Sequence, residues 1–168
     1  MNIWRKNAWA TVPYLDEKKI PKLVADVKAA NIYVTPTNYF FVSCFGEGLT
    51  EQQIKDRPDF GFIPAHIRDE RWKIRDRFWS NPPPEESRRK YISLRLKMTE
   101  ELWKNGVKLM AGSDSPEWFL MTGFTLHDEL ETFVRAGLSP MAALETATVN
   151  PAAYLGLTKK GAIEIGNG

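Results

Sequence analysis

The stretch Val107-Lys108-Leu109-Met110-Ala111-Gly112-Ser113-Asp114 contains the strongest indication of the fold. Its first five residues form a short and mostly apolar run, which is typical of a buried strand. Small residues and a carboxylate follow, at the end of the strand where ligands and catalytic groups gather in parallel α/β folds. Asp114 can serve there as a metal ligand or as a base toward a metal-bound water. Local sequence equally allows a turn-forming or helix-capping aspartate before Ser115-Pro116.

The residues on either side predict the order helix, turn, strand. A helix is expected over Glu85 to Lys104 and is ended by Asn105-Gly106. The same order occurs earlier, with a helix over Asp16 to Ala30 and a short β-branched strand at Ile32 to Pro36. Because this order is half of a βαβ unit, the sequence predicts an α/β fold with parallel strands.

The C-terminal third predicts three more helices and the start of a hairpin. Thr125 to Asp128 fits a capping box, Ser139-Pro140 an N-cap followed by proline, and Asn150-Pro151 a repeat of that device. The alternating segment Gly161 to Gly166 indicates the first strand of a β-hairpin.

Residues 38–84 interrupt this order. So long a connection is unusual in a compact domain unless it has a function, so we expect an inserted lid or substrate loop with short helices of its own. Its aromatic residues could shape an apolar substrate pocket, and the candidates are Tyr39, Phe41, Trp72 and Trp79. The mixture of cations and aromatics between Arg68 and Trp79 could also bind nucleic acid. The interspersed acidic residues favour a solvated helix face, and no nucleic-acid partner is expected.

Composition excludes several classes of protein. The 168 residues are 43% hydrophobic and 26% charged, with a net charge of +2, which is typical of a globular chain. Cys44 is the single cysteine, so an internal disulfide and a multi-cysteine zinc site are excluded. The apolar runs are too short to cross a membrane and no secretory signal is recognisable, so a cytoplasmic location is expected.

Four segments together resemble the C-terminal part of the metal-dependent amidohydrolases. They are Gly106 to Ser115, His127 to Glu131, Ala136 to Thr148 and Asn150 to Leu157, and the likeness is to the imidazolonepropionase-like and prolidase-like branch. Tyr33 to Thr37 resembles the seventh strand of the same branch. The resemblance implies the last part of a (β/α)8 TIM barrel, helix-rich and incomplete, with strands 7 and 8 and their helices. Residues 161–168 would start the chain's return to a truncated β-sandwich.

The resemblance also implies a chemistry. The family hydrolyses C–N bonds with water activated by a divalent metal, here expected to be zinc, and Asp114 would be a metal ligand or proton shuttle. Non-peptide amides, cyclic amides and dipeptides are the implied substrates.

This chain departs from the family pattern in its metal ligands. It has no His-x-His pair, and His66 and His127 are better explained as structural residues. We therefore expect a fragment that binds no metal by itself and is inactive. The alternative is a non-catalytic helical interaction module derived from the barrel tail. In either case, exposed strand edges could lead to self-association.

Overall fold

The structure, a computed structural model, describes residues 9–46 and 49–166. Its α-helices are α2 (Ile20–Ala29), α3 (Asn38–Phe41), α4 (Glu51–Lys55), α5 (Ala65–Trp79), α6 (Glu85–Lys104), α7 (Phe124–Arg135), α8 (Pro140–Ala147) and α9 (Val149–Tyr154). Short 3-10 turns are η1 (Val12–Tyr14), η2 (Glu17–Lys19) and η4 (Phe60–Phe62), and η3 (Val42–Gly46) is a π-helical turn.

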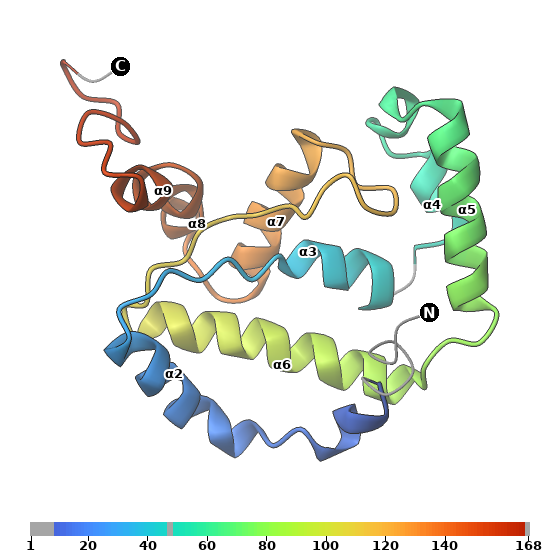
Figure 1. Ribbon diagram of the computed structural model, residues 1–168, viewed down its shortest axis with the longest axis horizontal. Helices are drawn as coiled ribbons and strands as arrows, with labels where there is room; N and C mark the ends of the chain where they lie inside the picture. Colours follow the sequence, from blue (N-terminus) through green and yellow to red (C-terminus); the bar gives the residue numbers. More distant parts are fainter. Residues whose placement is uncertain (1–8, 47–48, 167–168) are drawn as a thin grey trace.

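The long helix α6 is the axis of the molecule. In Figure 1, α2 and α3 run on opposite sides of it, α4 and α5 lie at one end of the molecule, and α8 and α9 lie at the other. Helix α6 has the bounds that the sequence predicted, and the chain turns away from it at Gly106, whose φ of +76° favours glycine. The Val107 N–H then donates to the Leu102 carbonyl at 3.0 Å, which closes the helix end.

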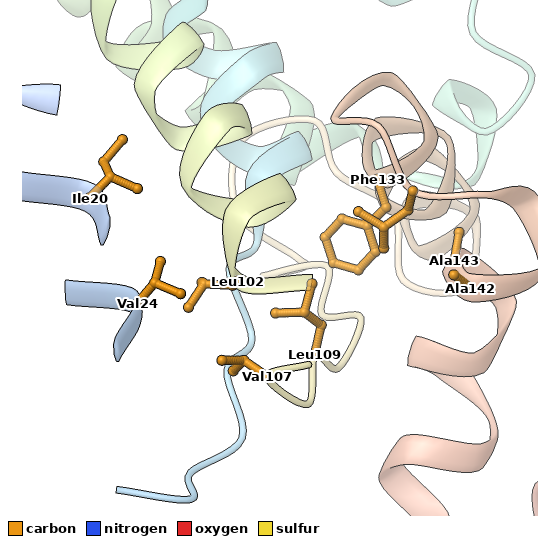
Figure 2. Close-up of a cluster of buried hydrophobic side chains, with 9 residues drawn as sticks. Ile20, Val24, Leu102, Val107, Leu109, Phe133, Ala142 and Ala143 are labelled. Carbon is orange, nitrogen blue, oxygen red and sulfur yellow. The ribbon is translucent and has the colours of Figure 1, made fainter. Parts of the chain in front are cut away.

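The main core joins helices from both halves of the chain. Figure 2 shows Ile20 and Val24 of α2 directed toward Leu102 of α6, while Leu109 and Phe133 lie further along the same cluster. Phe133 is fully buried, and burying an aromatic side chain of this size contributes about 1.5–3 kcal/mol. The core is therefore built from helices that lie far apart along the chain.

The predicted strands and barrel portion are wrong for the part of the chain that the structure describes. Within residues 9–46 and 49–166 there is no sheet, and the two expected strands meet only in one isolated parallel bridge between Val34 and Leu109. Two hydrogen bonds form it, from the Val34 N–H to the Lys108 carbonyl at 3.0 Å and from the Met110 N–H to the Val34 carbonyl at 2.9 Å. The fold is accordingly a helical assembly around one bridge.

Backbone groups of Leu109 and Ala111 that could pair with a further strand are hydrogen-bonded to helices instead. The Ala111 N–H donates to the Thr146 carbonyl at 2.9 Å, and the Asn150 amide nitrogen donates to the Leu109 carbonyl at 2.8 Å. Because buried backbone groups must be paired, these bonds to α8 and α9 stabilise the segment without β-pairing on that side.

Of the three helix starts predicted in the C-terminal third, one is confirmed and two are wrong. Ser139 caps α8, with its hydroxyl accepting the Ala142 N–H at 3.2 Å. Helix α7 has Gly123 at its N-cap, and Thr125 lies inside it, donating from its hydroxyl to the Met121 carbonyl at 3.0 Å. Helix α9 starts before Asn150, because that side chain bonds to Leu109 instead of capping.

Residues 38–84 contain short helices, as expected, but also the 15-residue helix α5. The solvated helix face favoured for Arg68 to Trp79 lies in this helix, but its bounds were not predicted, because it carries no single apolar face. Residues 161–166 form bends and turns, and residues 167–168 of the predicted sandwich return lie outside the described part. Among the described helices, none is long and apolar enough to cross a lipid bilayer.

Candidate functional site

Asp114 lies at the surface on a tight turn. Its φ is +54°, and its carbonyl accepts the Glu117 N–H at 3.4 Å, so the turn that local sequence allowed is present. The backbone makes this turn and the carboxylate remains exposed. Turn formation therefore leaves the Asp114 side chain available for chemistry.

The segment just before Asp114 packs against the end of the other predicted strand. A Cβ placed on Gly112 would lie 2.4 Å from Cγ2 of Thr35 and 3.4 Å from Cγ2 of Thr37. Only glycine allows this approach. The Asp114 turn is thus held beside residues 35–37, where the parallel bridge ends.

Aromatic residues of the 38–84 insertion hold the chain that follows Asp114. The ring of Trp118 lies 5.7 Å from that of Phe45 and 5.7 Å from that of Phe78, both edge to face. The neighbouring Phe119 lies 4.3 Å from Trp72 of α5. Such aromatic contacts contribute about 0.5–1.5 kcal/mol each beyond burial. The insertion is therefore packed against the loop that carries Asp114.

Two of the four proposed lid residues meet at one small cavity. Tyr39 and Trp79 both line a cavity of about 20 Å³, together with Cys44 and Trp118. This volume is enough for roughly one water molecule. Trp72 instead packs in the apolar cluster around Phe119.

The fourth proposed lid residue, Phe41, lies elsewhere. The guanidinium of Arg95 sits 3.6 Å from the centre of its ring, in a cation–π contact. The structure thus brings two of the lid residues together and separates the other two.

Cys44 is a buried thiol at this cavity. Burial raises its pKa to about 12, the Ser43 hydroxyl lowers it, and the carboxylates of Asp114 and Glu117 raise it further. A thiol with a raised pKa is a poor nucleophile at neutral pH.

An ion-pair network at Arg57 ties the insertion to α7. Arg57 donates from Nε to Asp59 at 3.0 Å and from Nη2 to Asp128 at 2.7 Å, and it also bonds the hydroxyl of Tyr39. Burial acts to lower the pKa of Arg57, but its hydrogen bonds to Asp59 and Asp128 outweigh this and raise it. The network keeps Tyr39 in place beside the cavity.

Glu129, the residue after Asp128, is a buried carboxylate that the sequence did not single out. It is 0% exposed and accepts the backbone N–H groups of Asn38 at 2.9 Å and Tyr39 at 2.6 Å. Burial raises its pKa to about 7, against the lowering effect of these two bonds and of Arg95. The sequence pointed to Glu129 only as a member of the segment His127 to Glu131, which resembles the amidohydrolases.

Comparison with known families identifies the chain. The model of the amidohydrolase family matches residues 14–167. The chain belongs to the amidohydrolase family. Neither the curated proteins nor the solved structures contain a match to it.

Membership in the amidohydrolase family confirms the resemblance at the level of the family, and it does not favour the non-catalytic helical module. The amidohydrolase family usually binds a divalent metal. In the described part of this chain, no group of three or more His, Cys, Asp or Glu side chains could hold a metal ion. His66 and His127 are both exposed. The described residues therefore do not fit such a metal by themselves.

Proposed function

We propose that this chain is part of a hydrolase that cleaves C–N bonds in small amides, of the imidazolonepropionase-like and prolidase-like branch. Non-peptide amides, cyclic amides and dipeptides are the proposed substrates. The observation that carries the proposal is the family match over residues 14–167. The four segments quoted from the sequence support the choice of branch.

Asp114 is the proposed catalytic residue. Its carboxylate is exposed, and Gly112 holds its turn against Thr35. A carboxylate in this place can take a proton from a water that attacks the amide carbonyl carbon, and then deliver that proton to the nitrogen as the C–N bond breaks. The insertion supports this role, since its aromatic residues hold the loop that carries Asp114.

The proposal assigns only this proton transfer to the described residues. Tight binding of zinc takes three or four ligands, and Asp114 would supply one of them. We propose that the remaining ligands come from polypeptide outside this chain, and that the chain alone binds no metal and is inactive.

A first experiment tests inactivity of the chain alone. The purified chain is assayed with zinc or manganese on cyclic amides, dipeptides ending in proline and acylated amines. The expected result is no turnover above the metal blank. Robust turnover that is lost in Asp114→Ala would overturn the proposed inactivity and support the catalytic residue.

A second experiment tests the role of Asp114 in an active protein. The gene region upstream of Met1 is expressed together with this chain, and hydrolysis of the same substrates is measured. Asp114→Asn is expected to lower kcat by about 10²–10⁴-fold, since general acid–base catalysis contributes that much. The matched control is Asp26→Asn, which removes an exposed carboxylate from the surface of α2. Equal kcat for Asp114→Asn and the control would refute the assignment.

A further inference from the structure

An apolar groove lies between α2 and α6, apart from the cavity beside the Asp114 loop. Its volume is about 430 Å³, within the range of sites that bind small molecules. The apolar residues that line it come from both helices and from the bridge segment: Ile20, Leu23, Val34, Leu94, Met98 and Leu102. The two sites share no lining residue.

The mouth of this groove carries exposed apolar side chains. Tyr14 is 85% exposed, Leu15 41% and Leu23 48%, and all three line the groove. Apolar residues that gather at the rim of a cavity, unlike single ones scattered on a surface, indicate a binding site.

Asn38 and Arg95 both line this groove, and each side chain has a buried polar atom without a hydrogen-bond partner among the described residues. The Thr99 hydroxyl donates to the Arg95 carbonyl at 3.1 Å, so it accepts the Asn38 amide nitrogen at 2.8 Å. This leaves Oδ1 of Asn38 as a buried acceptor without a hydrogen-bond partner among the described residues. Asn38 itself is 1% exposed.

The Nε–H of Arg95 is the second unpaired group. The terminal nitrogens of this guanidinium bond the Tyr91 hydroxyl at 3.2 Å and the Pro36 carbonyl, while Nε is buried without a partner in the described part of the chain. Each buried group left unsatisfied costs about 1–3 kcal/mol, so two of them in side chains that line one groove call for an explanation.

A ligand that pairs with both atoms must offer a donor to Oδ1 of Asn38 and an acceptor to the Nε–H of Arg95. A carboxylate has only acceptors and would repel Oδ1 of Asn38, and an ammonium has only donors and would face Arg95. A neutral carboxamide has an N–H₂ donor for Oδ1 and a carbonyl acceptor for Nε–H. We propose that this groove binds a small molecule with an apolar body and a neutral carboxamide head.

Binding requires a small movement at the inner end of the groove. Both polar atoms are covered from solvent, so the head group reaches them only when a lining side chain shifts. Met98 lines the groove, and its unbranched side chain can change rotamer at low cost.

The test is titration of the full chain with octanamide, followed by calorimetry and by thermal melting. Saturable binding and a raised Tm are expected. N,N-dimethyloctanamide lacks the donor for Asn38 and should bind roughly tenfold more weakly, the loss expected for one hydrogen bond. Octanoate should bind more weakly still.

Substitutions at the mouth locate the site. Leu23→Trp and Leu15→Trp fill the entrance from exposed positions and should each abolish octanamide binding while the circular dichroism spectrum stays unchanged. Leu144→Trp, at an exposed position of α8, is the matched control and should bind octanamide normally.

Three outcomes would overturn the proposal. They are no saturable binding of octanamide, equal affinity for the dimethyl amide, and unchanged affinity in both blocked variants. A dimer that dissociates in Leu23→Trp, with no octanamide binding, would assign the groove to a second copy of the chain. None of these readouts depends on hydrolysis at Asp114.

Discussion

The stability of this protein should fall as pH rises from 5 to 8, because Glu129 is buried. Its carboxyl is 0% exposed and burial raises its pKa from 4.5 to about 7. The folded state therefore holds the proton more tightly than the unfolded state. This stabilisation is present in full below pH 4.5 and is lost as pH rises through 7.

The magnitude follows from these two pKa values. Between pH 5 and pH 8, Glu129 should reduce the free energy of unfolding by about 2–3 kcal/mol. The variant Glu129→Gln cannot ionise, so its stability relative to the original chain should rise by that amount over the same range. Two backbone N–H groups and Arg95 favour the charged form, but burial outweighs them.

The assay is urea unfolding followed by circular dichroism at several pH values between 5 and 8. The difference in unfolding free energy between Glu129→Gln and the original chain is plotted against pH, so that other titrating groups cancel. Glu131→Gln, an exposed position on the same helix, is the control and should give a flat difference. The reasoning is refuted if the Glu129→Gln difference is also flat, or if this variant loses stability relative to the original chain as pH rises.

Two substitutions test the contacts around the site by urea unfolding. Arg57→Met should destabilise the chain by about 3–5 kcal/mol, because it leaves the buried Asp59 carboxylate without its partner; a loss below 1 kcal/mol would contradict this. Gly112→Ala should cost about 1–3 kcal/mol, because its Cβ would lie 2.4 Å from Cγ2 of Thr35. The added change Thr35→Ser should recover most of that loss, whereas Gly61→Ala, with nothing within 4 Å, should show no such steric cost.

The sequence predicted helix bounds correctly where capping and stop residues next to the helix mark them. The helix expected over Glu85 to Lys104, with its stop at Asn105-Gly106, has both bounds of α6, and Ser139-Pro140 marks the start of α8. These signals act through contacts three or four residues apart and through caps, so they need no tertiary partner. Helix α5 was expected only as a solvated helix face between Arg68 and Trp79, and its bounds were not predicted, because its apolar residues do not lie on one face.

The strand prediction failed for a reason that lies outside the strands. Ile32 to Pro36 and Val107 to Ala111 have the composition of strands and do lie side by side at Val34 and Leu109. Whether such segments extend into a sheet depends on which other groups pair with their backbone. Here two residues distant in sequence pair with the second segment: the Thr146 carbonyl accepts the Ala111 N–H, and the Asn150 side chain donates to the Leu109 carbonyl.

Some features of the candidate site could also be predicted from local sequence, and others could not. The sequence indicated Asp114 from its neighbours and the family from four short segments, and the family was confirmed over residues 14–167. The roles of Glu129 and Arg57 depend on hydrogen bonds to residues 90 and 71 positions away along the chain, which no local pattern encodes.

The bounds of α6, the start of α8 and membership in the amidohydrolase family were thus determined by the sequence alone, because each depends on residues close together along the chain. The tertiary structure alone decided that one parallel bridge forms where two strands were expected, that Glu129 is buried beneath Asn38 and Tyr39, and that the insertion packs on the Asp114 loop. These features depend on which distant groups come together, and that follows from the packing of the whole chain.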